Sequence, residues 1–353
     1  MKRKIGFLLL ISCTLVFSGC TKEERLITQQ QTEEMGMSLM DQGDYEGAVK
    51  AFDEALGLCL GNITNKEIEI NFYKAAAQYM SGDGEGALAT YTALIDYEKD
   101  DPKPYFLRGS AYLKQGETDL AISDYKSAVS LSDSDYEMYI ECYNNLHAAG
   151  LEAEALSFLN AALELNGRNA ESYLARGRIY LIMEQYDLAQ DQLITAKDKG
   201  LADAAVYLAQ VYQATGAIQS AESILTEYTA DGNASSVAMN IMAIIAMKDD
   251  DFQTALNYIN QGLALDEVTN QQSLMRNKII CLEKMGDFTE AYNTAAIYCE
   301  LYPKDDDASR ELTFLSTRNV SVVEEYYHMK DNEEESATDS ADTEEKTEEG
   351  DEE

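Results

Sequence analysis

One alanine that recurs at intervals near 34 residues constrains the fold of this chain more than any other feature. The intervals between its eight copies are 39, 34, 34, 34, 32, 34 and 36 residues. The copies are Ala48, Ala87, Ala121, Ala155, Ala189, Ala221, Ala255 and Ala291. A period of this length is typical of chains that stack copies of one small structural unit. The sequence therefore predicts about eight such units.

Two further positions keep the register of these alanines. Five residues before the alanine stands a glycine in six copies, with Glu184 and Asp250 in the other two. Twelve residues before it stands a glycine or an alanine in six copies, with Tyr143 and Ile279 in the other two. Glycine closes a helix because it adopts the left-handed conformation without a Cβ clash, and small residues let two helices cross closely. Each unit is therefore predicted to be an antiparallel helical hairpin.

The remaining sequence agrees with an all-α fold. The chain has only three prolines, which favours helices. Larger residues stand four positions after the recurring alanines, called register alanines below, and so lie on the same face of the second helix; examples are Phe52, Tyr125 and Leu159. One hairpin cannot bury its apolar face alone, so neighbouring hairpins stack. We expect a solenoid of about eight antiparallel helix-turn-helix repeats over residues 29–305, closed by a capping helix over residues 306–330.

This pattern resembles the tetratricopeptide repeat family, and residues 104–128 are its clearest copy. The resemblance covers about residues 29–305 and implies a right-handed superhelical solenoid. A Sel1-like repeat is the nearest alternative, but its period is longer and its glycines are placed differently. The glycines and the lack of a sustained heptad exclude a coiled coil.

The first twenty residues are typical of an export signal. A basic stretch over residues 2–4 precedes an apolar stretch over residues 5–17 that is too short to span a bilayer. The Phe-Ser-Gly-Cys sequence that ends at Cys20 resembles the lipobox of bacterial lipoproteins. The resemblance implies a diacylglycerol on Cys20 and a lipid-anchored protein on the exported side of a bacterial cell membrane. An ordinary secretory signal with an incidental cysteine is the alternative.

The charge of the chain argues against nucleic acid as a partner. Acids outnumber bases 64 to 27, and the net charge is −37, whereas nucleic-acid binding needs clustered lysine and arginine. Residues 331–353 hold 13 acids and one lysine, and a segment of this composition is expected to be disordered. The predicted boundaries are a signal peptide over 1–19, a lipidated N-terminus and short tether over 20–28, the solenoid over 29–305, the capping helix over 306–330 and the acidic tail over 331–353.

Side chains that could support catalysis are few. The only histidines are His147 and His328, and neither has the neighbours of a catalytic triad or of a metal site. No glycine-rich phosphate-binding loop is present, so neither a nucleotide nor another cofactor is expected. Cys281 and Cys299 fall in neighbouring predicted helices and could pair, although ordinary buried thiols are the favoured state. We expect a protein that is not an enzyme.

The family resemblance also implies a binding surface. In that family the first helix of each hairpin lines a concave groove with its second, fifth, ninth and twelfth residues. Mapped onto this chain, these positions form an apolar, partly aromatic stripe that suits an extended peptide or a helix. Packing of the same side chains inside the superhelix is the alternative. The predicted groove residues are Phe72, Tyr79, Phe106, Leu113, Ile140, Asn144, Leu174, Arg178 and Leu181.

Together these features favour a membrane-anchored scaffold or adaptor that binds a protein partner in its groove. Contact with the membrane is expected through the lipid anchor only. The alternative is a binding module for envelope polysaccharide. Such a module needs exposed aromatic platforms, and the absence of tryptophan counts against it.

Overall fold

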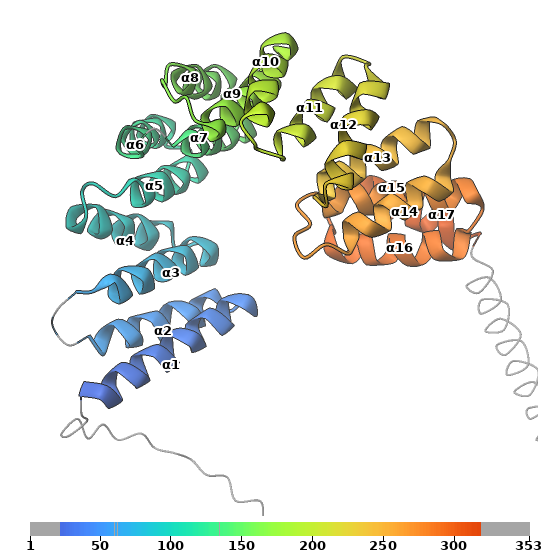
Figure 1. Cartoon of the computed structure of the whole chain (residues 1–353). Coiled ribbons are helices and arrows are strands. Elements are labelled where there is room, and N and C mark those ends of the chain that lie inside the picture. The colour runs from blue at the N-terminus through green and yellow to red at the C-terminus, as the bar shows by residue number, and fades with distance from the viewer. Residues whose placement is uncertain (1–21, 60, 62, 134, 319–353) are drawn as a thin grey trace, which may run out of the picture. The chain divides into compact units, whose positions relative to one another are not determined.

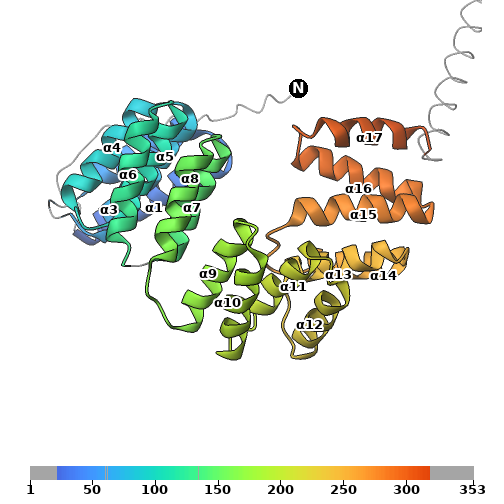
Figure 2. The same ribbon diagram turned by 90° about the horizontal axis from the view of Figure 1, so that it is seen from above.

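The protein is all-helical in the residues that its computed structural model describes, which are 22–59, 61, 63–133 and 135–318. Seventeen helices follow one another in these ranges without a strand (Figures 1 and 2). None of these helices has both the length and the apolar content that crossing a bilayer requires. Their bounds are α1 Lys22–Asp41, α2 Tyr45–Gly57, α3 Asn65–Ser81, α4 Gly84–Tyr97, α5 Pro102–Lys114, α6 Thr118–Leu131, α7 Tyr136–Ala148, α8 Glu152–Leu163, α9 Ala170–Ile182, α10 Tyr186–Asp198, α11 Ala204–Ala214, α12 Ile218–Ala230, α13 Ser236–Lys248, α14 Phe252–Leu263, α15 Gln271–Met285, α16 Phe288–Leu301 and α17 Asp306–Ser316.

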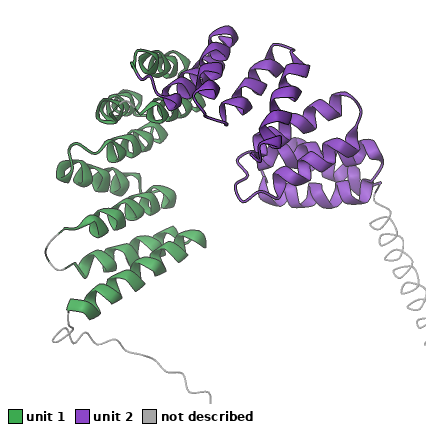
Figure 3. Ribbon diagram, in the orientation of Figure 1, with its two compact units in different colours: residues 1–166 green, residues 167–353 purple. Residues whose placement is uncertain are grey.

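The chain divides into two compact units, residues 1–166 and residues 167–353 (Figure 3). Unit 1 contains α1 to α8, and unit 2 contains α9 to α17. Within each unit every odd-numbered helix packs against the even-numbered helix that follows it, and α17 packs on α16. The described part of the chain is therefore eight hairpins and one further helix, which confirms the predicted all-α repeat fold.

The eight register alanines lie at the centre of this packing, and each is 0% exposed. In unit 1, Ala48 and Phe52 of the first hairpin share a core cluster with Ile70 of α3. In unit 2, Ala221 of α12 shares a cluster with Ile241 of α13. Each of these clusters joins one hairpin to the next, as expected of an array whose members cannot bury their apolar faces alone.

The two ends of the array differ from the expected boundaries in one respect. The first helix begins at Lys22, so most of the expected tether over residues 20–28 belongs to α1. At the other end, α17 buries Ala308 and Leu315 in one cluster with Tyr298 of α16. The predicted signal peptide, Cys20, the rest of the capping helix and the acidic tail lie outside the described residues.

The turns that close the first helices are left-handed at the register position. Gly116 after α5 has φ of 83°, and the other five register glycines also have positive φ. Glu184 and Asp250 take the same conformation, with φ of 57° and 58°, although they carry side chains. The left-handed conformation costs a residue with a Cβ about 1–2 kcal/mol. The turn geometry is thus kept even where the glycine is missing.

The small residues at the helix crossings have no room for a larger side chain. A Cβ on Gly109 would lie 2.9 Å from the ring of Tyr125. A Cβ on Gly177 would lie 2.5 Å from Cγ of Leu193. In both hairpins the residue that fills the space stands four positions after the register alanine. The large residue of the second helix therefore packs directly on the backbone of the first.

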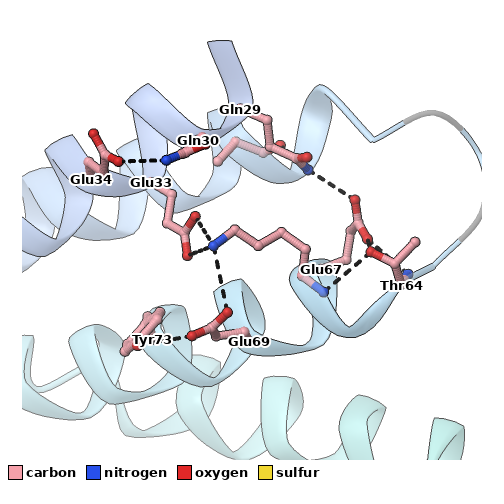
Figure 4. Close-up of polar contacts among 10 residues, drawn as sticks. Gln29, Gln30, Glu33, Glu34, Thr64, Glu67, Glu69 and Tyr73 are labelled. Carbon is pink, nitrogen blue, oxygen red and sulfur yellow. Dashed lines mark hydrogen bonds and ion pairs between the residues drawn. The ribbon is translucent and has the colours of Figure 1, made fainter. Parts of the chain in front are cut away.

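A buried polar network joins the first two hairpins of unit 1 (Figure 4). Glu33 of α1 is 2% exposed, and its carboxylate oxygens lie 2.7 and 2.5 Å from Nζ of Lys66 in α3. Gln29 of α1 donates a hydrogen bond of 3.0 Å to Glu67 of α3. Glu67 also accepts hydrogen bonds from the backbone nitrogen and the hydroxyl of Thr64, which caps α3. The network pairs the buried Glu33 carboxylate with a lysine, gives the buried Glu67 carboxylate hydrogen bonds from Gln29 and Thr64, and so fixes α1 against the start of α3.

Cys281 and Cys299 are free thiols in this structure, so they are not paired with each other. Burial raises the pKa of the Cys142 thiol and raises that of Cys281 to about 11. Thiols with raised pKa values carry little thiolate and are poor nucleophiles.

Substitution of glycine at the two exceptional turns is expected to stabilise the protein. Glu184→Gly and Asp250→Gly should each raise the free energy of unfolding by about 0.5–1 kcal/mol, because they relieve a left-handed residue that has a Cβ. Gly116→Ala should lower it by a similar amount. Urea denaturation followed by circular dichroism measures the stability of all three variants. A loss of stability in both glycine variants would contradict the claim that Glu184 and Asp250 hold an unfavourable left-handed conformation.

Substitution at a helix crossing is expected to have the opposite sign. Gly177→Ala should lower the free energy of unfolding by about 1–2 kcal/mol, since overpacking outweighs the gain in helix propensity. Gly57→Ala is the matched control because nothing lies within 4 Å of the Cβ that it adds. The control should leave the stability unchanged or slightly higher. Equal urea midpoints for the two variants would show that the crossing at Gly177 is not close-packed.

The stability of the first two hairpins is expected to depend on pH through Glu67. Burial alone would raise the pKa of this carboxyl group, but hydrogen bonds from Thr64 and Gln29 outweigh burial and lower its pKa from 4.5 to about 2. The stabilisation is therefore complete above pH 4.5 and is lost as the pH falls through 2. At pH 7, Glu67→Gln should reduce the free energy of unfolding by about 2 kcal/mol, and this difference should shrink between pH 4.5 and pH 2.

The control for this measurement is Glu34→Gln, on an exposed carboxylate of the same helix pair. The free energy of unfolding of this variant should differ little from that of the unchanged chain, both at pH 7 and at pH 2.5. A difference between Glu67→Gln and the unchanged chain that stays the same from pH 7 to pH 2.5 would contradict the role given to this carboxylate.

Candidate partner-binding site

The predicted groove residues of unit 1 are only partly open. Phe72 and Tyr79 of α3 are half-buried and pack against the core cluster that contains Tyr91. Nζ of Lys103 lies 4.4 Å from the centre of the Phe72 ring, and Nζ of Lys114 lies 4.0 Å from that of Tyr79. Burial raises the pKa of Tyr79. Both rings are therefore partly covered by the lysines of the next first helix, α5.

The other predicted residues of unit 1 range from buried to exposed. Phe106 packs on Tyr125 with ring centres 5.5 Å apart, and Leu113 is half-buried. Ile140 is 4% exposed, so the structure places it in the core and not on an open surface. Asn144 is exposed. The alternative of internal packing thus accounts for part of this stripe, and a binding role for its open members stays a prediction.

His147 of unit 1 is exposed at the end of α7. Its Nδ1 atom lies 2.5 Å from a carboxylate oxygen of Glu152, and its ring stacks on that of Tyr143. These contacts give the histidine a surface role at the turn of its hairpin. Among the residues with described positions, no group of three or more His, Cys, Asp or Glu side chains is arranged to hold a metal ion.

In unit 2 the predicted residues lie on α9. Leu174 and Leu181 are half-buried and pack against the cluster that contains Leu193 and Leu208. The guanidinium carbon of Arg178 lies 5.4 Å from the centre of the Tyr207 ring in α11. Leu174 also lines a cavity of about 340 Å³, and its binding role stays a prediction.

This cavity, called the α9–α13 pocket below, is formed by successive first helices of unit 2. Its apolar wall comes from Leu174 of α9, Val206 of α11 and Val237 of α13. Tyr207 adds an aromatic ring, and Asp203 and Glu267 add exposed carboxylates. Of the described residues that line it, none is a lysine, arginine or histidine. Arg178 already lies over the Tyr207 ring, so the two carboxylates and the apolar wall are the features that suit a further cationic side chain with an apolar stem.

Tyr228 also lines this pocket, beside Asp203. The Tyr228 hydroxyl donates a hydrogen bond of 3.1 Å to Asp203. Burial, with a further contribution from the negative charge of Asp203, raises the pKa of Tyr228 to about 12. The hydrogen bond also holds the Asp203 carboxylate in place at the start of α11.

A second hollow also lies on unit 2. It has a volume of about 440 Å³ and is lined by residues of α13 and α15, together with Tyr298 of α16 and Asp305. Asn277 donates a hydrogen bond of 2.8 Å to Asn240, and Arg276 is paired with Glu311 at 2.7 Å. Asparagine side chains carry both a donor and an acceptor, so they match the peptide groups of an extended chain. Val237 and Asn240 lie one turn apart on α13, and each lines one of the two hollows.

The sequence prediction stopped at the fifth repeat and missed most of this surface. The signal was present, because Phe72, Phe106 and Leu174 each stand fifteen residues before a register alanine. The same offset in the later repeats gives Val206, Asn240 and Arg276. All three line the hollows of unit 2.

Comparison with protein families and with curated proteins gives matches to parts of the chain. Two family models described as tetratricopeptide repeat match residues 34–62 and 74–136. DnaJ homolog subfamily C member 3 from Gallus gallus is 22% identical over 167 residues, which are 47% of this chain. The chain spans only 29% of the length of that curated relative.

Solved structures with similar folds include two that cover most of this chain. A tetratricopeptide repeat protein from Parabacteroides merdae ATCC 43184 is 14% identical with a TM-score of 0.48, over 72% of this chain and 99% of that one. Yeast Tom70 is 14% identical with a TM-score of 0.40, over 86% of this chain and 92% of that one. The chain therefore carries tetratricopeptide repeats, which the family models match at residues 34–62 and 74–136 and whose hairpin and register recur in all eight hairpins of the described residues.

Proposed function

We propose that the protein is a lipid-anchored scaffold on the exported side of a bacterial membrane, and that it holds a protein partner on the first-helix face of unit 2. The α9–α13 pocket carries this proposal, because three successive first helices contribute to it and its apolar wall meets two carboxylates. Such a surface recognises a chain that runs across several repeats.

The partner segment is basic and extended. A lysine or arginine fits the α9–α13 pocket, with its aliphatic stem against Val206 and Val237 and its charge near Asp203 and Glu267. The peptide groups that follow this side chain in the partner meet the side-chain amides of Asn240 and Asn277 in the second hollow. The net charge of −37 speeds the encounter with a basic partner and disfavours an acidic one.

The membrane part of the proposal rests on the sequence of residues 2–20. These residues lie outside those that the structure describes, and the support is the resemblance of the segment ending at Cys20 to a lipobox. The action is binding and not catalysis, as in tetratricopeptide repeat scaffolds generally. The lipid would concentrate the scaffold at the membrane, where its partner is assembled or held.

Substitution of the two pocket carboxylates tests the proposal. Asp203→Asn combined with Glu267→Gln should reduce the protein captured from detergent-solubilised envelope membranes by about tenfold or more, since truncating charge pairs in an interface typically costs over 1.4 kcal/mol. Capture is quantified by mass spectrometry of the bound proteins.

The matched control is Asp198→Asn combined with Glu222→Gln, which makes the same change in charge on the exposed surfaces of α10 and α12. The control should capture the same proteins as the unchanged chain. Equal loss in both double variants would reduce the effect to net charge. Protein capture that survives the pocket variant, together with lost binding to envelope polysaccharide, would favour the polysaccharide alternative.

A further inference from the structure

The start of α1 lies very close to the proposed site of the lipid. The helix begins at Lys22, two residues after Cys20. Two fully extended residues span at most about 7 Å. A lipid on Cys20 therefore holds the first turn of α1 at the level of the lipid headgroups, because no flexible tether of useful length separates them.

Three exposed apolar side chains lie near this end of unit 1. Leu26 and Ile27 in the second turn of α1 are 48% and 52% exposed. Ile63, between α2 and α3, is 53% exposed. Exposure of large apolar side chains to water is unfavourable, and their transfer to a lipid interface lowers the free energy.

Hydrogen bonds of Gln29 show that these side chains share one end of the hairpin pair. Its side-chain amide donates to the carbonyl oxygen of Ala55 near the end of α2 at 3.2 Å, and to Glu67 in the first turn of α3 at 3.0 Å. Ile63 directly precedes Thr64, the cap of α3, and therefore lies at the same end of the hairpin pair as the start of α1. Figure 4 shows Gln29, Thr64 and Glu67 together at this end.

The same network fixes the direction of α1. The buried Glu33 carboxylate pairs with Lys66, so α1 cannot swing away from α3 without exposing or orphaning a charge. Beyond the second turn the exposed residues of α1 include Gln30, Gln31 and Glu34, and its next exposed apolar side chains are Met35 and Met37. The polar residues that separate these methionines from Leu26 and Ile27 favour a helix that stands on its first turns.

We propose that unit 1 stands end-on upon the bilayer, with Leu26, Ile27 and Ile63 at the lipid headgroups and α1 pointing away from the membrane. The inference rests on the proposed lipid at Cys20. It adds that the anchor sets the orientation of unit 1, because a rigid, clamped helix follows the lipid directly.

The absence of tryptophan from the chain permits a direct test. The full lipidated protein is placed in phosphatidylcholine vesicles, a neutral lipid chosen because the acidic chain disfavours anionic ones. Leu26→Trp and Ile63→Trp each introduce the only tryptophan. Met37→Trp is the control, 40% exposed and about 16 Å farther along the axis of α1. Fluorescence is recorded with ordinary and with brominated acyl chains.

We expect the emission of Leu26→Trp and Ile63→Trp to move to shorter wavelength on the vesicles and to be quenched by bromine, whereas that of Met37→Trp does neither. Shift and quenching at all three positions would mean that α1 lies flat and would overturn the proposal. No shift at Leu26 or Ile63 would also overturn it. Mass spectrometry of the N-terminal peptide shows whether Cys20 carries the lipid. A Cys20 without lipid would contradict both the proposed anchor and the proposed orientation, whereas a lipidated Cys20 without a shift at Leu26 or Ile63 would contradict the orientation alone.

Discussion

The close crossing of two helices at a buried alanine is the contact on which the rest of this structure depends. At each crossing whose small residue is glycine, the second helix packs a large side chain directly on the backbone of the first, as Leu193 does at Gly177. The same large side chains extend the core toward the next hairpin, so one repeated contact both closes a hairpin and stacks its neighbour. Because each hairpin contacts mainly its neighbours, its outer surface is free to vary and to carry function.

Much of this fold could be predicted from the sequence, because the spacing of small residues reports the crossing directly. The eight buried alanines and the left-handed turns follow from that spacing. Glu184 and Asp250 adopt the same left-handed conformation, so the turn is kept where the register position has no glycine. The start of α1 was misplaced since it precedes the first register residue. Periodicity also does not show how much of the first-helix face, which carries the predicted groove residues, is exposed to solvent. That depends on side chains from the next hairpin, such as Lys103 on Phe72.

The two units present different surfaces to a partner. In unit 1 the first-helix face is partly closed by its own lysines, and its far end carries the exposed apolar residues near the proposed anchor. In unit 2 the corresponding face combines apolar walls with carboxylates and amides, and Arg178 lies over the Tyr207 ring. This division agrees with a scaffold that uses one unit for attachment and the other for recognition.

The central claim is that the first-helix face of unit 2 holds a basic protein segment. Site-specific photocrosslinking in the full-length, membrane-bound protein tests it most directly, with the reactive side chain placed at Val237 inside the α9–α13 pocket or at the exposed Leu188 of α10. The account predicts a crosslink from Val237 to a protein segment rich in lysine or arginine, and none from Leu188. Crosslinks from both positions alike, or from Val237 to polysaccharide alone, would contradict it.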